Sequence, residues 1–102
     1  MSKPMYIYIL TNKTKNVLYT GVSNNLCRRM REHRSDSIEG FTKQYHVHRL
    51  VYYEAHEDSY TAISREKQLK AGSRKRKVEL IESINPEWRD LFQELCGDDD
   101  YL

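Results

Sequence analysis

Two side chains of residues 26–33 have the types and the spacing needed to handle a phosphate group and a proton. Arg29 and His33 are four residues apart, so on a helix they share one face, next to the apolar stripe of Leu26 and Met30. A planar guanidinium can bind the oxygens of a phosphodiester in a bidentate manner while negative charge develops on them. An imidazole can transfer a proton near neutral pH. The alternatives are an ordinary surface arginine, one of several in this segment, and a structural histidine.

Tyr8 and Tyr19 are predicted to stand side by side on a β-hairpin. Residues 6–10 and 18–22 alternate as half-buried strands do, and the polar stretch between them predicts a turn. A turn centred on residues 13 and 14 places the two phenols directly opposite each other on one face. A phenol has a pKa of about 10, and a nearby cation would lower that pKa. The remaining tyrosines are expected mainly to pack: Tyr6, Tyr45, Tyr52, Tyr53 and Tyr60.

A carboxylate is predicted on the buried side of a later helix. Ala62, Ile63 and Leu69 define that side, and at about 100° per residue Glu66 points into the middle of it. A buried carboxylate is costly unless another group pairs with it. An ion pair with Arg29 or a hydrogen bond from a tyrosine would explain Glu66 without any chemistry, and the spacing alone supports this explanation as well as a functional one.

The elements that must position these residues form a small mixed domain. After the hairpin and the first helix, residues 34–45 predict an ordered loop and residues 50–55 a third strand. Asp58 or Ser59 begins a second helix, which Gly72 ends. The prediction is therefore an α/β (α+β) fold with a small three-stranded antiparallel sheet flanked by helices.

Two further helices complete the predicted order β-β-α-β-α-α-α. The first covers residues 74–84, and its inward-facing side chains are Val78, Ile81 and Ile84. Asn85 then caps the last helix, with Pro86 at its first position and an apolar stripe of Trp88, Leu91, Phe92 and Leu95. A single domain is expected over residues 1–96, followed by an acidic, frayed tail at 97–102.

The composition excludes a membrane protein. The chain has 102 residues, of which 31% are charged, and no apolar run approaches the roughly 20 residues that span a bilayer. The N-terminus lacks the pattern of a secretion signal, so a cytoplasmic location is expected. Cys27 and Cys96 have no metal-type spacing and are predicted to be reduced thiols. His46, His48 and His56 show no ligand spacing and are not assigned a role.

The charge distribution favours nucleic acid only weakly. The net charge is +2, and three aspartates of the tail hide a larger positive excess in the rest of the chain. A basic run lies immediately beyond Glu66 and includes Lys70, Arg74 and Lys75. Together with Arg28, these three residues are candidate contacts to phosphates. The alternative is an ordinary solvated face.

Taken together, these residues resemble the GIY-YIG nuclease domain. The segment Tyr6-Ile7-Tyr8 stands at the first tripeptide of that family and Tyr19-Thr20-Gly21 at the second. Arg29 and His33 follow at the family's spacing, and Glu66 lies in an Ala-x-x-Arg-Glu-x-x-x-Lys context. Tyr6 and Thr20 depart from the glycine and isoleucine of the name, as in the small stand-alone bacterial members of UPF0213 type.

The resemblance implies a metal-dependent endonuclease that hydrolyses phosphodiester bonds in nucleic acid, with DNA as the expected substrate. It implies that Glu66 is the ligand of one divalent cation, Mg²⁺ or Mn²⁺, that Tyr8 helps to deprotonate the attacking water and that Tyr19 positions this water. The alternatives are a non-catalytic nucleic-acid-binding module and a structural adaptor. Because no recognition domain is appended, specificity is expected from the domain itself or from a protein partner.

Overall fold

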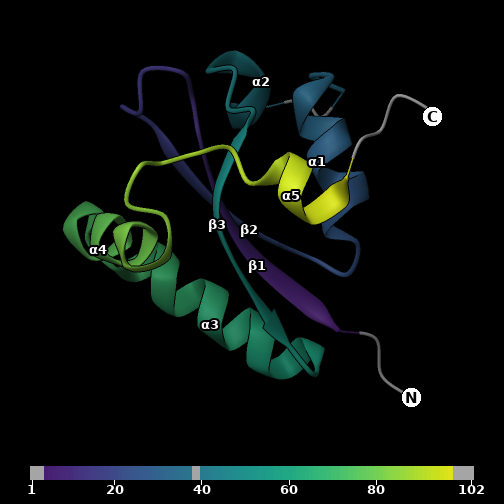
Figure 1. The fold of residues 1–102 in the computed structure, drawn as a ribbon. Coiled ribbons are helices and arrows are strands. Elements are labelled where there is room, and N and C mark those ends of the chain that lie inside the picture. The colour runs from purple at the N-terminus through teal and green to yellow at the C-terminus, as the bar shows by residue number, and fades with distance from the viewer. Residues whose placement is uncertain (1–3, 38–39, 98–102) are drawn as a thin grey trace.

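Three antiparallel strands form the centre of the protein (Figure 1). The computed structural model describes residues 4–37 and 40–97. Strand β1 (Met5–Thr11) lies between β2 (Leu18–Ser23) and β3 (Arg49–His56), which gives the sheet order β2-β1-β3. Ile7, Tyr8, Ile9 and Leu10 of the central strand are all buried, because helices cover both faces of the sheet.

The longer helices of the described residues, together with the last helix, lie on the two faces of the sheet. Figure 1 shows α3 (Ser59–Ala71) and α4 (Arg74–Ile84) on one face, and α1 (Leu26–Arg34) and α5 (Phe92–Cys96) on the other. The short helix α2 (Phe41–Gln44) lies within the segment that was predicted to be a loop. Side chains alternate accordingly along β1: Tyr8 packs in a cluster with residues of α1 and α5, whereas Ile7 packs against α3. The predicted fold class and element order are confirmed.

Polar residues fix where the longer helices begin. Asn25 accepts a hydrogen bond from Arg28 N at the start of α1. Asp58 and Ser73 do the same for the amides of Thr61 and Arg76 at the starts of α3 and α4. Each cap satisfies an amide that the helix itself leaves without a partner. The bounds of α3 and α4 therefore agree with those predicted.

The hairpin register differs from the prediction by two residues. Tyr8 pairs with Gly21, and Tyr19 pairs with Leu10. The turn is centred further along the chain, because Lys15 adopts a left-handed conformation (φ 64°) and its amide donates to Asn12 O at 3.0 Å. A shift of two residues keeps both tyrosines on the same face, so the phenols are diagonal neighbours instead of direct partners.

The C-terminal helix is shorter than predicted, and Asn85 does not begin it. Asn85 ends α4, and its amide group donates to Val51 O and Arg89 O and accepts from Arg89 N. These bonds hold residues 86–91 along β3, where Leu91 N donates to Leu50 O at 2.7 Å. The apolar residues Trp88, Leu91 and Phe92 are nevertheless buried.

Several single-residue predictions about packing are wrong. Ile84 and Ile63 are exposed, because the contact stripes of their helices run through Ile81 and through Ala62 and Leu69. Tyr60 faces solvent in the first turn of α3, and Tyr45 is exposed on one side of its ring. Periodicity predicts the centre of an apolar face well and its margins poorly.

The prediction of reduced thiols is also wrong. Cys27 of α1 and Cys96 of α5 form a disulfide, with their Cα atoms 5.6 Å apart and a sequence separation of 69. The two helices pack on the same face of the sheet around Phe92, and this tertiary contact has no signal in the spacing of the cysteines. Disulfides are uncommon in the cytoplasm, so the expected location stays a prediction.

Two predictions concern the ends of the chain. Gly97 ends α5, but the remainder of the predicted frayed tail lies outside the described residues. In the part of the chain that is described, no helix has the length and hydrophobicity needed to cross a bilayer.

Candidate active site

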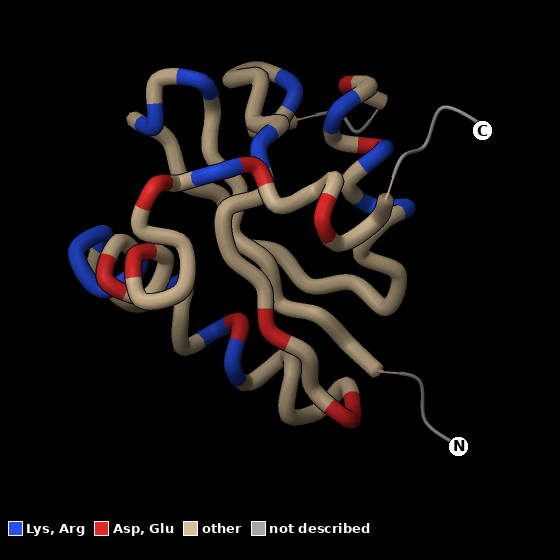
Figure 2. Tube along the Cα trace, in the orientation of Figure 1, with Lys and Arg blue, Asp and Glu red and all other residues tan. Residues whose placement is uncertain are grey.

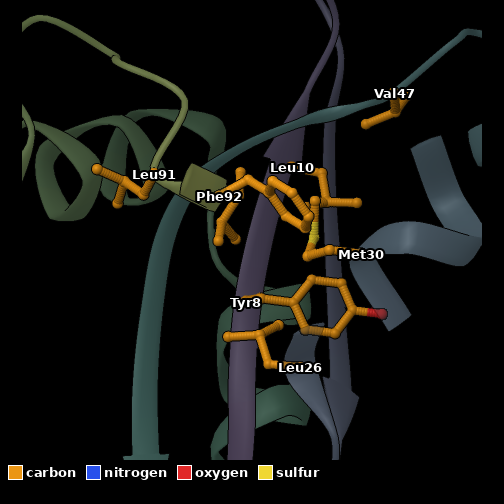
Figure 3. Packing of buried hydrophobic residues seen from close by; sticks show 8 residues of the cluster. Tyr8, Leu10, Leu26, Met30, Val47, Leu91 and Phe92 are labelled. Carbon is orange, nitrogen blue, oxygen red and sulfur yellow. The ribbon is translucent and has the colours of Figure 1, made fainter. Parts of the chain in front are cut away.

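Tyr8 reaches the edge of the sheet because its strand partner is a glycine. A Cβ atom at Gly21 would overlap Cζ and Oη of Tyr8. The phenol therefore lies across β2 with its ring between Leu26 and Met30, and its hydroxyl points out of the apolar cluster (Figure 3). This role of Gly21 was not predicted, although a glycine inside a strand pattern is a signal of close approach.

A chain of hydrogen bonds runs from Tyr8 into the protein. Tyr8 Oη is 3.2 Å from Nε2 of His33, and Nδ1 of His33 is 3.0 Å from Oγ1 of Thr42. His33 is only 2% exposed. A neutral imidazole has one donor nitrogen and one acceptor nitrogen, so one of the two hydroxyls donates to His33 and the other accepts from it. Thr42 is a site residue that the sequence did not indicate, because its position depends on α2.

Tyr19 closes the other side of this arrangement. Its ring centroid is 6.3 Å from that of Tyr8 and 5.6 Å from that of His33. On its far side it stacks on Phe41 of α2 at 6.1 Å, and Phe41 in turn contacts Tyr45 at 4.8 Å. This row of rings leads from the buried hydrogen bonds to the surface, where Phe41 and Tyr45 are exposed.

Arg29 lies beside Tyr8 and His33 with its charge accessible to solvent. Its nearest acid is Glu32, one turn along α1, with Nε and Oε1 3.6 Å apart. The Arg29 side chain is 36% exposed, yet its Nε atom is buried and makes no hydrogen bond to any described residue. A buried guanidinium N–H without an acceptor is unusual, and a phosphate oxygen is the kind of acceptor that it favours.

Burial keeps both Tyr8 and His33 neutral near pH 7. It raises the pKa of Tyr8 well above its usual value, with Tyr19 and Glu66 adding to this rise and Arg29 opposing it. Burial and the nearby charge of Arg29 lower the pKa of His33 to about 4. Tyr8 can therefore release its proton only when additional positive charge or a proton acceptor is present.

Glu66 lies in the opposite layer, near enough for its charge to act on Tyr8. It lies on α3, which packs against β1 and β2, and its charge contributes to the raised pKa of Tyr8. The side chain is 15% exposed and pairs with Lys70, with Nζ and Oε2 3.2 Å apart. The partners suggested by the sequence, Arg29 or a tyrosine, are therefore replaced by a neighbour on the same helix.

The predicted phosphate contacts are distributed over both layers. Arg28 is exposed on α1 and Lys75 on α4, whereas Lys70 is engaged with Glu66. Arg74 donates to Lys15 O at 2.6 Å and thereby holds α4 against the hairpin turn. Figure 2 shows basic residues both at that turn and along the start of α4.

Comparisons with known proteins show which family this chain resembles. A family model described as the GIY-YIG catalytic domain matches residues 4–79. A UPF0213 protein of Clostridium perfringens is 38% identical over 76% of this chain and 83% of its own, and one of Syntrophus aciditrophicus is 37% identical over 80% and 93%. The solution NMR structure of a UPF0213 protein from Bacillus halodurans superimposes with a TM-score of 0.55 at 27% identity, covering 88% of this chain and 95% of that one.

Proposed function

Because the chain belongs to the GIY-YIG family, we propose that it is an endonuclease that hydrolyses phosphodiester bonds in nucleic acid, preferably DNA, with the help of one divalent cation. Family membership implies a nuclease-type function, whereas the UPF0213 names of the relatives state no activity. The observation that supports the proposal most is the convergence of Tyr8, Tyr19, Arg29 and His33 at one edge of the sheet, with Glu66 acting on the same phenol from the other layer.

Arg29 has the role of binding the scissile phosphate. Its side chain is partly exposed, and its buried Nε has no hydrogen-bond acceptor among the described residues. Hydrolysis of a phosphodiester increases the negative charge on the non-bridging oxygens, and a fixed guanidinium stabilises that charge without reorganising. Glu32 at 3.6 Å orients the group in the absence of substrate.

Glu66 fits a hard dication such as Mg²⁺ or Mn²⁺. A single carboxylate suits these ions, which keep most of their waters and take further oxygen ligands from substrate phosphates. In the absence of metal, the Glu66 carboxylate, which is only 15% exposed, forms an ion pair with Lys70. When bound, the cation would add positive charge at the scissile group and lower the pKa of water.

Tyr8, His33 and Thr42 are arranged to move one proton. If Nδ1–H of His33 donates to Thr42, the lone pair of Nε2 faces the Tyr8 hydroxyl. Tyr8 can then pass its own proton to Nε2 while it accepts one from the attacking water. The positive charge of Arg29 disfavours protonation of His33. A negative phosphate bound at Arg29 would weaken this effect. Tyr19 has the role of positioning the water.

The experiment compares cleavage of supercoiled plasmid and branched DNA in Mg²⁺, Mn²⁺ and EDTA. Arg29→Lys keeps the charge but loses the planar fork, so we expect normal melting and DNA binding with cleavage reduced about 10²-fold or more. Glu66→Gln should abolish the response to metal. Arg89→Lys, at an exposed arginine paired with Glu94 outside the candidate site, is the matched control and should cleave normally.

One outcome would favour the non-catalytic alternative. The folded protein could bind DNA and yet give no more product with Mg²⁺ or Mn²⁺ than with EDTA. In that case Tyr8, whose pKa is raised by burial, keeps its proton and takes no part in cleavage. The chain would then be a nucleic-acid-binding module, and a protein partner would supply any turnover.

A further inference from the structure

Three side chains of metal-ligating types converge next to the C-terminal end of α2. They are Asp36, His46 and His48, and one ligand atom of each lies within 4.8 Å of the other two. His48 Nε2 is 2.8 Å from Asp36 Oδ1, and His46 Nδ1 is 3.6 Å from Asp36 Oδ2. The two imidazole rings meet edge to face, with their centroids 5.8 Å apart.

The backbone places all three side chains without help from a ligand. Asp36 follows the end of α1 and His46 follows the end of α2, and both adopt the left-handed conformation (φ 57° and 53°). The buried Val47 separates the two histidines, so that they project together away from the core. Such conformations are uncommon for residues other than glycine, and here two of them turn donor atoms toward one point.

We propose that Asp36, His46 and His48 form a binding site for a transition-metal dication, with Zn²⁺ as the preferred ion. Two imidazoles and one carboxylate suit Zn²⁺ and its neighbours in the first row and do not suit Mg²⁺. Ligand bonds of about 2.0–2.1 Å in a tetrahedron require ligand atoms about 3.3 Å apart. His48 Nε2 lies 2.8 Å from Oδ1 of Asp36 and His46 Nδ1 lies 3.6 Å from its Oδ2, so each imidazole faces one carboxylate oxygen at a distance near this value.

The site is open to solvent, and the basic residues Lys13, Arg34 and Arg49 line the same pocket as His46 and His48. The His46 side chain is 73% exposed, so a water can occupy the fourth position. Arg34 is close, donating to His48 O at 3.3 Å, but its charge is paired with Asp90 at 2.7 Å. The ligand set of two neutral imidazoles and one carboxylate contributes a single negative charge toward the dication.

A metal at this site would clamp the segment that supports the candidate active site. Residues 36 and 48 bracket α2, which presents Thr42 to His33 and Phe41 to Tyr19. Closing this loop through an ion reduces the freedom of the segment in the unfolded chain. The expected effect is a more stable position for α2, independent of the Glu66 cation.

The test is calorimetric titration of the whole protein with Zn²⁺ alone, followed by titration with Co²⁺ observed through its visible absorption. We expect one saturable zinc site and the intense visible bands of tetrahedral Co²⁺. His46→Asn and Asp36→Asn should weaken zinc binding at least about tenfold. Asparagine tolerates the left-handed backbone at both positions, so these variants should fold.

Two control variants separate this site from other places that attract cations. Glu66→Gln removes the proposed catalytic ligand, and Asp99→Asn reduces the charge of the acidic tail. Both should bind zinc as the wild type does, and zinc should raise the melting temperature of both by about 5–10 °C at saturating concentration. Absence of saturable binding, or equal affinity in wild type and His46→Asn, would overturn the proposal. Loss of binding in Glu66→Gln alone would overturn it as well.

Discussion

The replacement of Gly21 by alanine should damage the protein through a single contact. The new methyl group would overlap Cζ and Oη of Tyr8. The phenol has little room to retreat, because it is 2% exposed and packs among Leu26, Met30 and Phe92. Tyr8 must therefore leave its rotamer or β1 and β2 must separate, and either change disturbs the hydrogen bond to His33.

The magnitude follows from two contributions. Forcing one methyl group into a packed core costs about 1–3 kcal/mol, and the loss of a buried hydrogen bond adds about 0.5–1.5 kcal/mol. The sum is about 1.5–4.5 kcal/mol, which for a domain of this size lowers the melting temperature by roughly 6–36 °C. Under the proposed mechanism, the cleavage rate should also fall at temperatures where the variant is still folded, because Tyr8 would no longer face His33.

The assay is thermal and urea unfolding followed by circular dichroism, with Gly72→Ala as the matched control. Gly72 has φ −76°, and a Cβ there would meet Leu69 O at 3.4 Å, so this alanine should be nearly neutral. Tyr8→Phe removes Oη, one of the three Tyr8 atoms that a Cβ at Gly21 would meet within 3.0 Å, so the double variant Tyr8→Phe/Gly21→Ala should be less destabilised than the sum of the single variants. Melting of Gly21→Ala close to that of Gly72→Ala, or strict additivity in the cycle, would refute the reasoning.

Three further predictions use different readouts. Neutral replacements of Lys70, Arg74 and Lys75 should weaken binding to all DNA sequences alike and flatten its dependence on salt; unchanged affinity in a filter-binding assay would return these residues to the solvated surface. His33 has a folded pKa of about 4 against an ordinary value of 6.5. The unfolded chain therefore binds the extra proton, and stability should fall by up to about 3 kcal/mol as the pH drops from 6.5 to 4. His33→Gln should flatten that part of the pH profile of urea unfolding, and an unaltered profile would contradict the assignment. Reduction of the disulfide, which closes a loop of 69 positions, should lower the free energy of unfolding by about 4 kcal/mol in the chain-entropy description, and equal urea midpoints with and without reductant would disprove this.

The parts of the fold that depend on local sequence could be predicted well. The capping residues Asp58 and Ser73 fix the starts of α3 and α4, and the apolar alternation of residues 6–10 identifies the central strand. Local signals failed where a distant group decides the outcome. Asn85 is a good helix-capping residue in isolation, but its side chain is used by Val51 and Arg89.

In the candidate site, too, features set by local sequence could be predicted and features set by distant groups could not. The sequence predicted the residue types and the faces on which they lie, because helix and strand periodicity determine these. It did not predict the register that sets Tyr8 against Gly21, since this depends on the left-handed Lys15. Nor did it indicate that Thr42 supports His33, or that Lys70 would pair with Glu66. The contact of Thr42 with His33 depends on where two elements meet, and no pattern within either element encodes it. The Glu66–Lys70 pair, by contrast, has the i, i+4 spacing within α3 that the sequence could have indicated.

The disulfide makes the protein tolerant of a broken backbone. Every residue of the candidate active site precedes Gly72, whereas Ile81, Trp88 and Phe92, which complete the packing on the sheet, follow it. A cut between Gly72 and Ser73 would leave two fragments that Cys27 and Cys96 still join covalently. The second fragment would then stay at a high effective concentration next to its own binding surface, and only a reductant would let it diffuse away. A nicked molecule of this kind would be a two-piece protein whose assembly depends on the redox state of its surroundings.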